Sequence, residues 1–196
     1  TGRNQPNLCM TGMIAMATSQ QFRRGDTVVG SMSGCGTFAE ETIVPGFAAI
    51  KIDQAVPLDV AALIGCGVTT GVGAAMNTAK VSPGSSVCII GAGGVGVAAI
   101  QGARIAGAAE IVAIDLHEGK LERAKAFGAT HGAGPEDVPA VMAEVTGGEG
   151  FDYTLECIGM PTTMRQAFDL TRRGGTCCIV GVGRAEETFE LSAFEM

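Results

Sequence analysis

Three glycines followed by an acidic residue form the pattern in this chain with the clearest chemistry. Gly91, Gly93 and Gly96 come directly after an apolar run that ends at Ile90, and Asp115 lies 19 residues after Gly96. In such a pattern the first glycine permits a tight turn, the second lets a pyrophosphate approach the backbone, and the third lets a helix pack close to a strand. A carboxylate at this distance can accept both hydroxyls of a ribose. The spacing therefore predicts a dinucleotide-binding site.

The charge of Asp115 also favours one kind of dinucleotide. The helix expected after the glycines would present free N–H groups and the positive end of its dipole to the phosphates. A carboxylate at the ribose would repel a 2′-phosphate, so the pattern predicts NAD rather than NADP. The competing interpretation is a glycine-rich turn between a strand and a helix that binds nothing.

The segments around these residues predict a parallel sheet covered by helices on both faces. Short strands alternate with helices of 10 to 15 residues, which is typical of a doubly wound α/β fold with right-handed crossovers. The expected strands are 87–90, 111–114, 129–134, 151–158 and 175–182, with a further short strand over 187–191.

The first part of the chain has a different character. Its short alternating runs predict strands over 27–32, 38–44 and 48–52. From Pro57 onwards two helices are expected, over 57–64 and 68–80, and a Gly-Cys-Gly triplet around Cys66 should interrupt them. A thiolate in such a break could meet a cation, although an ordinary small residue is the competing interpretation.

The composition excludes several classes of partner. The net charge of −7 leaves no clustered basic surface for nucleic acid. No apolar run of about 18 residues is free of turn glycines, so we expect no membrane span. The seven cysteines form no even framework, and Cys88, Cys177 and Cys178 fall in expected core strands. These features predict a cytoplasmic protein with reduced thiols.

Taken together, several motifs resemble the zinc-containing medium-chain alcohol dehydrogenases. They are LIGCGVTTG from Leu63, SPG from Ser82, GAGGVG from Gly91, then Asp115, and FGATH from Phe127. Within that family the chain is most similar to the bacterial alcohol dehydrogenases and the thiol-dependent formaldehyde dehydrogenases. The resemblance implies a Rossmann-type doubly wound parallel sheet preceded by a remnant of a GroES-like, β-rich catalytic domain. It implies a partial catalytic domain over 1–66 and a dinucleotide-binding domain over 67–196 that lacks its last strand.

The resemblance also implies roles for particular residues. Cys66 matches a ligand of the catalytic zinc, Thr70 matches a threonine beside the nicotinamide, and Cys9 matches the last of four ligands of a structural zinc. The remaining positions match residues that bind the cofactor: Gly91, Gly93, Gly94, Val95, Gly96, Asp115, Lys120, Ile158, Gly159, Val180 and Val182.

The activity implied is hydride transfer between an alcohol or thiol-hemiacetal and NAD, assisted by zinc. The resemblance also implies a small alcohol or aldehyde substrate and a homo-oligomer formed through the sheet edge of the full protein. The other zinc ligands are expected upstream of Thr1 and the last strand downstream of Met196, so we expect this chain to be an inactive fragment. Two alternatives are a non-catalytic NAD-binding module and a zinc-free quinone reductase of the same superfamily, against which Cys9 and Cys66 argue.

Overall fold

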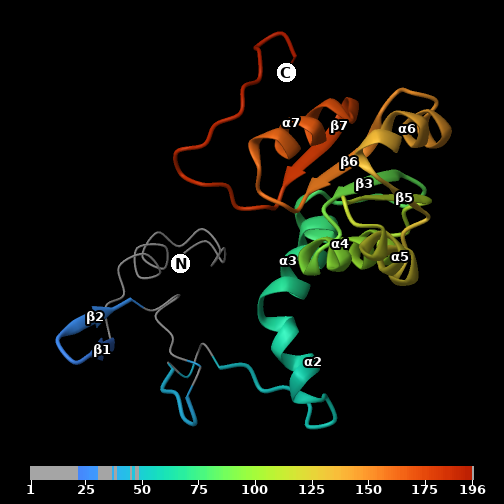
Figure 1. Cartoon of the computed structure of the whole chain (residues 1–196). Helices are drawn as coiled ribbons and strands as arrows, with labels where there is room; N and C mark the ends of the chain where they lie inside the picture. Colours follow the sequence, from blue (N-terminus) through green and yellow to red (C-terminus); the bar gives the residue numbers. More distant parts are fainter. Residues whose placement is uncertain (1–21, 31–36, 38, 45, 47–48, 196) are drawn as a thin grey trace. The chain divides into compact units, whose positions relative to one another are not determined.

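The computed structural model describes residues 22–30, 37, 39–44, 46 and 49–195, and the chain divides into two compact units, Thr1–Ala55 and Val56–Met196. The predicted boundary between residues 66 and 67 instead falls inside a helical segment, and the assignment of the two domains stays a prediction. Each unit is described by itself below (Figure 1).

The described part of the first unit contains one antiparallel hairpin. Strands β1 (Phe22–Arg24) and β2 (Thr27–Val29) pair across a turn at Gly25, which has a φ of 61°. This hairpin fits a remnant of a β-rich domain. The predictions of strands over 38–44 and 48–52 are wrong for 39–44 and 49–52, and Phe38 and Ala48 lie outside the described residues. A strand needs a paired neighbour, and within the described residues β1 and β2 pair only with each other.

The second unit contains the predicted parallel sheet. Its five strands have the order β5-β4-β3-β6-β7, and every neighbouring pair is parallel. The chain therefore changes direction across the sheet at β3, which has β4 on one side and β6 on the other. The strands are β3 (Ser86–Ile90), β4 (Glu110–Ile114), β5 (His131–Ala133), β6 (Phe151–Glu156) and β7 (Thr171–Ile179).

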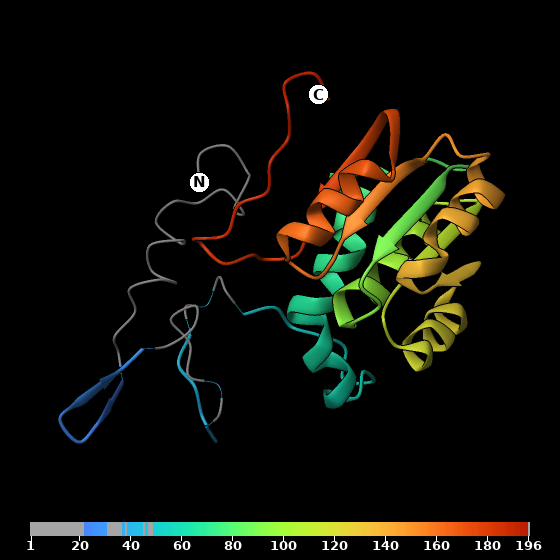
Figure 2. The same cartoon turned by 45° about the horizontal axis from the view of Figure 1, so that its top comes forward.

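Helices cover both faces of this sheet, as Figures 1 and 2 show. Because side chains alternate along a strand, Val87 and Ile89 face one layer while Cys88 and Ile90 face the other. The first layer holds α4 (Gly94–Ile105) and α5 (Glu118–Phe127), and the second holds α6 (Val138–Thr146) and α7 (Pro161–Asp169). A 3₁₀ turn, η6 (Pro135–Asp137), precedes α6.

The segment around Cys66 differs from the prediction. The chain stays helical from Leu58 to Thr78, through α2 (Leu58–Leu63), η4 (Ile64–Val68), α3 (Thr69–Gly73) and η5 (Ala74–Thr78). The two glycines beside Cys66 do not end the helix, and the chain passes through them as the π turn η4.

Length and composition alone would let this helical segment cross a membrane, which is weak evidence because core helices of globular proteins pass the same test. A Cβ placed on Gly71 would lie 2.6 Å from Cβ of Ala98, so the second half of the segment packs tightly on α4. The absence of a membrane span stays a prediction.

The last part of the chain also differs from expectation. Strand β7 begins at Thr171 rather than Gly175, because α7 ends at Asp169 and the register beside β6 shifts between Phe151 and Tyr153. A bulge of this kind lets extra residues enter a strand without losing the pairing beyond it. Residues 187–191 do not form the further strand that the sequence predicted.

A carboxylate joins the amino ends of three strands. Asp152 accepts hydrogen bonds from the backbone N–H of Ser86 at 2.8 Å, the Ser86 hydroxyl at 3.0 Å and Nε of Arg172 at 2.7 Å. The bond from the Ser86 N–H, helped by the Arg172 guanidinium, outweighs burial and holds the pKa of Asp152 below its usual value. The ionised side chain therefore stabilises the amino ends of these strands, at the end of the sheet opposite to the glycine turn.

Replacing this carboxylate with an amide should give a pH-dependent loss of stability. Both oxygens of Asp152 accept from N–H donors, so D152N places its NH₂ against a donor in either orientation and should lower the free energy of unfolding by about 1–3 kcal/mol near neutral pH. The folded pKa is depressed, so the contribution is complete above the unfolded pKa of about 3.9 and is lost as the pH falls through the folded pKa. Urea unfolding at about pH 7 and about pH 3 should show this difference shrinking; an equal difference at both would contradict it.

Candidate dinucleotide site

The turn between β3 and α4 has the shape that the glycine spacing predicts. Gly91 has a φ of 95°, and a Cβ on Gly96 would lie 1.7 Å from the carbonyl oxygen of Gly91. The third glycine of the pattern is therefore required for helix and strand to meet. Around Gly93 and Gly94, by contrast, nothing lies within 4 Å of the position that a Cβ would take. These two residues leave open space beside the backbone, as a pyrophosphate would need.

The first turn of α4 offers donors to an anion. Gly93 precedes the helix in an extended conformation, and no side chain caps the helix. The first N–H groups of a helix have no partner within the helix, and the helix dipole places partial positive charge there. Gly94, Val95 and Gly96 form this first turn, so the structure places these three predicted cofactor residues where phosphate oxygens could bind.

Asp115 lies beside this turn, directly after β4. Its Oδ2 accepts hydrogen bonds from the N–H of Ala92 at 2.9 Å and from Nζ of Lys120 at 3.2 Å, and its Oδ1 accepts from the N–H of His117 at 3.0 Å. Burial favours the neutral acid, but the bonds from His117, Ala92 and Lys120 outweigh it and lower the pKa of Asp115. The structure therefore brings the predicted pair Asp115 and Lys120 together with the glycine turn, and keeps the carboxylate ionised.

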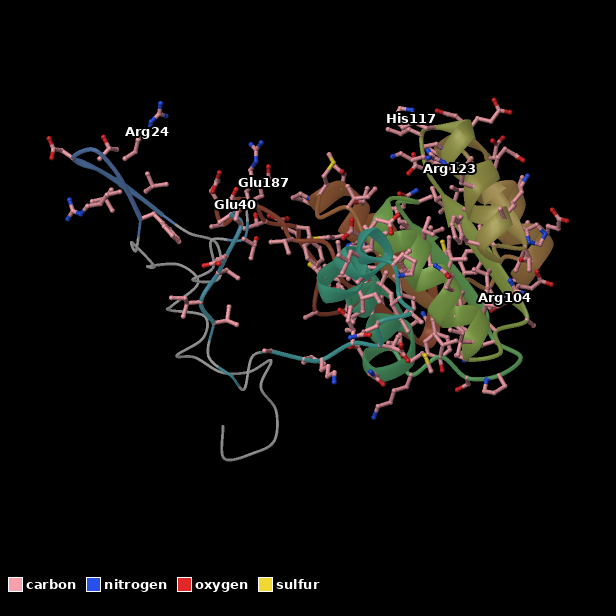
Figure 3. All side chains as sticks on the ribbon, turned by 90° about the horizontal axis from the view of Figure 1, so that it is seen from below. Arg24, Glu40, Arg104, His117, Arg123 and Glu187 are labelled. Atoms are coloured by element: carbon pink, nitrogen blue, oxygen red, sulfur yellow. The ribbon has the colours of Figure 1, made fainter. Side chains whose placement is uncertain are left out.

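A cavity of about 500 Å³ opens next to the glycine turn. It is lined by residues of the turn, of the helical segment before it, and of α5. Figure 3 shows His117, just before α5, and Arg123, in the middle of α5, lying well apart from Arg104 at the end of α4. The cations beside the cavity are thus Lys120 and Arg123. The lining includes Leu63, Gly67, Val68, Gly93, Gly94, Val97, Gln101, Lys120, Arg123 and Phe127.

The predicted residues after β6 and β7 also meet near the carboxyl ends of the strands. A Cβ on Gly91 would lie 2.6 Å from Cγ1 of Ile158, so Ile158 packs directly on the glycine turn. A Cβ on Gly159 would lie 2.6 Å from the carbonyl oxygen of Val182. The N–H of Val180 donates to the carbonyl oxygen of Glu156 at 2.8 Å. In open α/β sheets ligands bind outside this edge, at the point where the strand order reverses.

The two residues predicted to take part in catalysis lie on the helical segment before the sheet. Cys66 and Thr70 are both exposed, and the hydroxyl of Thr69 donates to the carbonyl oxygen of Cys66 at 3.1 Å. Gly67, next to Cys66, lines the cavity at the glycine turn. The described residues contain no group of three or more His, Cys, Asp or Glu side chains that could hold a metal, and Cys9 lies outside them. Cys66 is thus a single candidate ligand, and the described residues alone do not form a zinc site.

The predicted core cysteines agree with the structure in part. Cys88 is fully buried and Cys178 is 8% exposed, whereas Cys177 is only half-buried. Burial raises the pKa of both Cys88 and Cys178, so these thiols stay protonated and inert.

The predicted site residues that line the cavity are Gly93, Gly94 and Lys120, and the residues that the pattern missed include the long side chains of Gln101, Arg123 and Phe127. Gln101 lies two turns into α4, and the other two lie further along α5. They come together only because the two helices pack on the same face of the sheet. A helical repeat of three to four residues from Lys120 would have found Arg123 and Phe127 on one face of α5.

Comparison with known proteins agrees with this site. Residues 94–195, just over half of the chain, match the family described as zinc-binding dehydrogenase. The chain is 45% identical over 205 residues to alcohol dehydrogenase class-3 of Caenorhabditis elegans, covering 97% of this chain and 53% of that protein. It is 42% identical over 202 residues to S-(hydroxymethyl)glutathione dehydrogenase of Photobacterium damsela subsp. piscicida, covering 97% and 54%.

A solved structure supports the same fold. Benzyl alcohol dehydrogenase from Acinetobacter calcoaceticus superposes with a TM-score of 0.70 at 35% identity, over 74% of this chain and 41% of that one. The chain spans about half the length of the curated relatives it matches. The glycine turn, the ionised Asp115 beside it and the match over residues 94–195 agree, and the chain belongs to the zinc-binding dehydrogenase family.

Proposed function

We propose that this chain carries the dinucleotide-binding part of an NAD-dependent, zinc-dependent alcohol dehydrogenase. The observation that supports it most is the position of Asp115. Its carboxylate is ionised, accepts from the N–H of Ala92 inside the glycine turn, and lies beside the open space at Gly93 and Gly94. A ribose with two free hydroxyls fits beside such a carboxylate better than one that carries a 2′-phosphate.

In the proposed reaction an alcohol carbon gives a hydride to the nicotinamide while the alcohol oxygen loses a proton. The residues of this chain would bind and orient the cofactor: the first turn of α4 at the pyrophosphate, Asp115 and Lys120 at the ribose, and Ile158 against the turn. A bound zinc would supply Lewis-acid polarisation of the alcohol oxygen. Cys66 is the described residue that we propose as one of its ligands, with Thr70 one turn further along the same helical segment.

The names of the relatives suggest a class of substrate. Two of them are an alcohol dehydrogenase class-3 and an S-(hydroxymethyl)glutathione dehydrogenase, and the identity extends over 97% of this chain. We therefore propose an alcohol formed by addition of a thiol to an aldehyde as the substrate of the whole protein. We also propose a cytoplasmic location and assembly through the β7 edge of the sheet.

Calorimetric titration of this chain with NAD and with NADP, and zinc analysis of the same sample, would test the proposal. We expect saturable, one-to-one binding of NAD, with binding of NADP at least about tenfold weaker, because Asp115 would face the 2′-phosphate. No heat of binding for either dinucleotide would contradict the proposed site. Binding of NAD without zinc would agree with a cofactor-binding unit of a dehydrogenase, and equally with a non-catalytic NAD-binding module. Adding an alcohol to the zinc-loaded full protein distinguishes the two, because only a dehydrogenase would then form NADH.

A further inference from the structure

A second buried carboxylate lies at the carboxyl edge of the sheet, at the end of β6. The side chain of Glu156 is fully buried, whereas most glutamates in folded proteins are exposed. Glu156 is the last residue of β6, which pairs with β3 at the point where the strand order reverses. A buried carboxylate is retained only where donors compensate its loss of water, so its partners indicate what it does.

One oxygen of Glu156 takes all of the donors. Oε1 accepts from the N–H of Ile158 at 2.9 Å, the N–H of Gly159 at 2.8 Å and the hydroxyl of Thr163 at 2.7 Å. Two successive backbone N–H groups thus point at a single oxygen. The turn between β6 and α7 is therefore held by this side chain, and the Thr163 bond joins it to the first turn of α7.

The other oxygen has no partner among the described residues. Oε2 is buried without a hydrogen bond, and a Cβ on Gly181 would lie 2.6 Å from it. The backbone carbonyl of the same residue accepts from the N–H groups of Val180 and Gly181 at 2.8 and 2.9 Å. Glu156 therefore contacts the turn after its own strand and the end of β7.

The turn that Glu156 holds is itself in contact with the glycine turn. The side chain of Ile158 packs on Gly91, and the N–H of Cys157 donates to the carbonyl oxygen of Ile90 at 2.9 Å. A shift of the Ile158 backbone would therefore move a side chain that packs on the dinucleotide loop. Ile158 remains 45% exposed, so part of it is available to a ligand at this edge.

We infer that Glu156 is a positioning residue for the dinucleotide site: its Oε1 sets the backbone at Ile158 and Gly159 and so places Ile158 against the glycine turn. The inference rests on the proposed function, because it assigns Glu156 to the site that would bind NAD. Glu156 would act on the site only through the position of Ile158, without contacting the cofactor itself.

Three single variants of this chain separate positioning from general stability. E156L removes every acceptor at similar volume, and E156Q keeps one oxygen that can accept all three bonds at the Oε1 position. D152N is the matched control, since Asp152 lies on the same strand, also accepts three hydrogen bonds, and joins the opposite edge of the sheet. We expect E156L to bind NAD at least about tenfold more weakly, and E156Q and D152N to stay within about threefold of the parent chain.

Two readouts distinguish the possible results. In calorimetry Kd reports the site only while the variant is mostly folded, because reversible unfolding raises the apparent Kd. Circular dichroism of each variant therefore accompanies the titration, and a purely stabilising role predicts weaker binding only in variants that are partly unfolded. Amide exchange adds a readout that needs no cofactor. Relative to the buried amides of β3 in the same variant, the N–H groups of Ile158 and Gly159 should exchange at least about tenfold faster in E156L and at an unchanged relative rate in D152N. If E156L does not fold, E156D serves instead, because it draws the carboxylate back by one methylene. E156D should likewise bind NAD more weakly, and its N–H groups at Ile158 and Gly159 should exchange faster.

The failure of this inference and that of the proposed function look different. A parent chain that binds no NAD contradicts the proposed function, and the exchange rates then still test the role of Glu156. A parent chain that binds NAD while E156L binds equally tightly, or while D152N or E156Q is weakened as much as E156L, overturns the inference. Unchanged exchange at Ile158 in E156L overturns it as well.

Discussion

Replacing Gly96 with alanine is expected to prevent stable folding of the sheet unit. A Cβ at this position would lie 1.7 Å from the carbonyl oxygen and 2.9 Å from the carbonyl carbon of Gly91. The obstacle is backbone directly after β3, whose last four residues are buried, so no side-chain rotation can relieve it. Displacing β3 from α4 would disturb the packing of Ile89 and Ala99 in the main hydrophobic core. We expect a loss of about 4 kcal/mol or more in the free energy of unfolding, which urea denaturation followed by circular dichroism would measure.

Gly94 provides the matched control for this substitution. It lies two residues earlier, also in the first turn of α4, and nothing lies within 4 Å of a Cβ built there. G94A should fold normally and gain up to about 1 kcal/mol from the higher helix propensity of alanine. Its methyl group would occupy the open space beside the turn, so NAD affinity should fall while stability does not. Equal stability of G96A and the parent chain would contradict the close approach of helix and strand.

The substitution D115N tests whether the carboxylate of Asp115 binds the ribose of NAD. Oδ2 accepts from the N–H of Ala92 and Oδ1 accepts from the N–H of His117, so an amide placed here turns its NH₂ toward a donor in either orientation. Loss of an ionised acceptor is worth about 1.5–3 kcal/mol. We therefore expect NAD to bind about 10- to 100-fold more weakly to D115N, as measured by calorimetry. The affinity for NADP should fall less than the affinity for NAD, because the charge that repels the 2′-phosphate of NADP is removed.

The control for D115N lies at the start of α5. Glu118 is an exposed carboxylate three residues later, so E118Q removes the same charge from the same part of the surface. A general electrostatic effect on the dinucleotide would weaken binding equally in both variants. We expect E118Q to stay within about threefold of the parent chain, and an unchanged NAD affinity in D115N would show that Asp115 does not bind the ribose.

Local patterns in the sequence were sufficient for most of the sheet unit. The order of strand, glycine turn, helix and strand over residues 86–115 is confirmed, since the apolar runs, turn glycines and helical spacing act over short distances. The left-handed glycine at the end of α5, Gly128 with a φ of 118°, and the proline at the start of α7 agree for the same reason. The family was also recognisable from these short motifs, and the match over residues 94–195 confirms it.

The errors fall where an element depends on a partner distant in the chain. The strands expected over 38–44 and 48–52 required neighbours that local alternation cannot supply. The start of β7 at Thr171 depends on a bulge against β6, which the sequence of β7 alone does not encode. The helix through Cys66 continues as a π turn over Ile64–Val68, although glycine by itself favours a break.

The sequence by itself was sufficient to predict the kind of ligand and the residues that would meet it, because the glycine spacing and the acid after β4 act within one strand–helix–strand unit. The roles proposed for Cys66, Thr70 and the other site residues stay predictions. Only the tertiary structure decided which residues outside this strand–helix–strand unit pack against it. Glu156 is distant from Gly91 in the chain, yet its strand pairs with β3 and its hydrogen bonds hold Ile158 on the glycine turn. Such a contact depends on which strands become neighbours in the sheet, and pairing between distant strands is set by the packing of the whole unit.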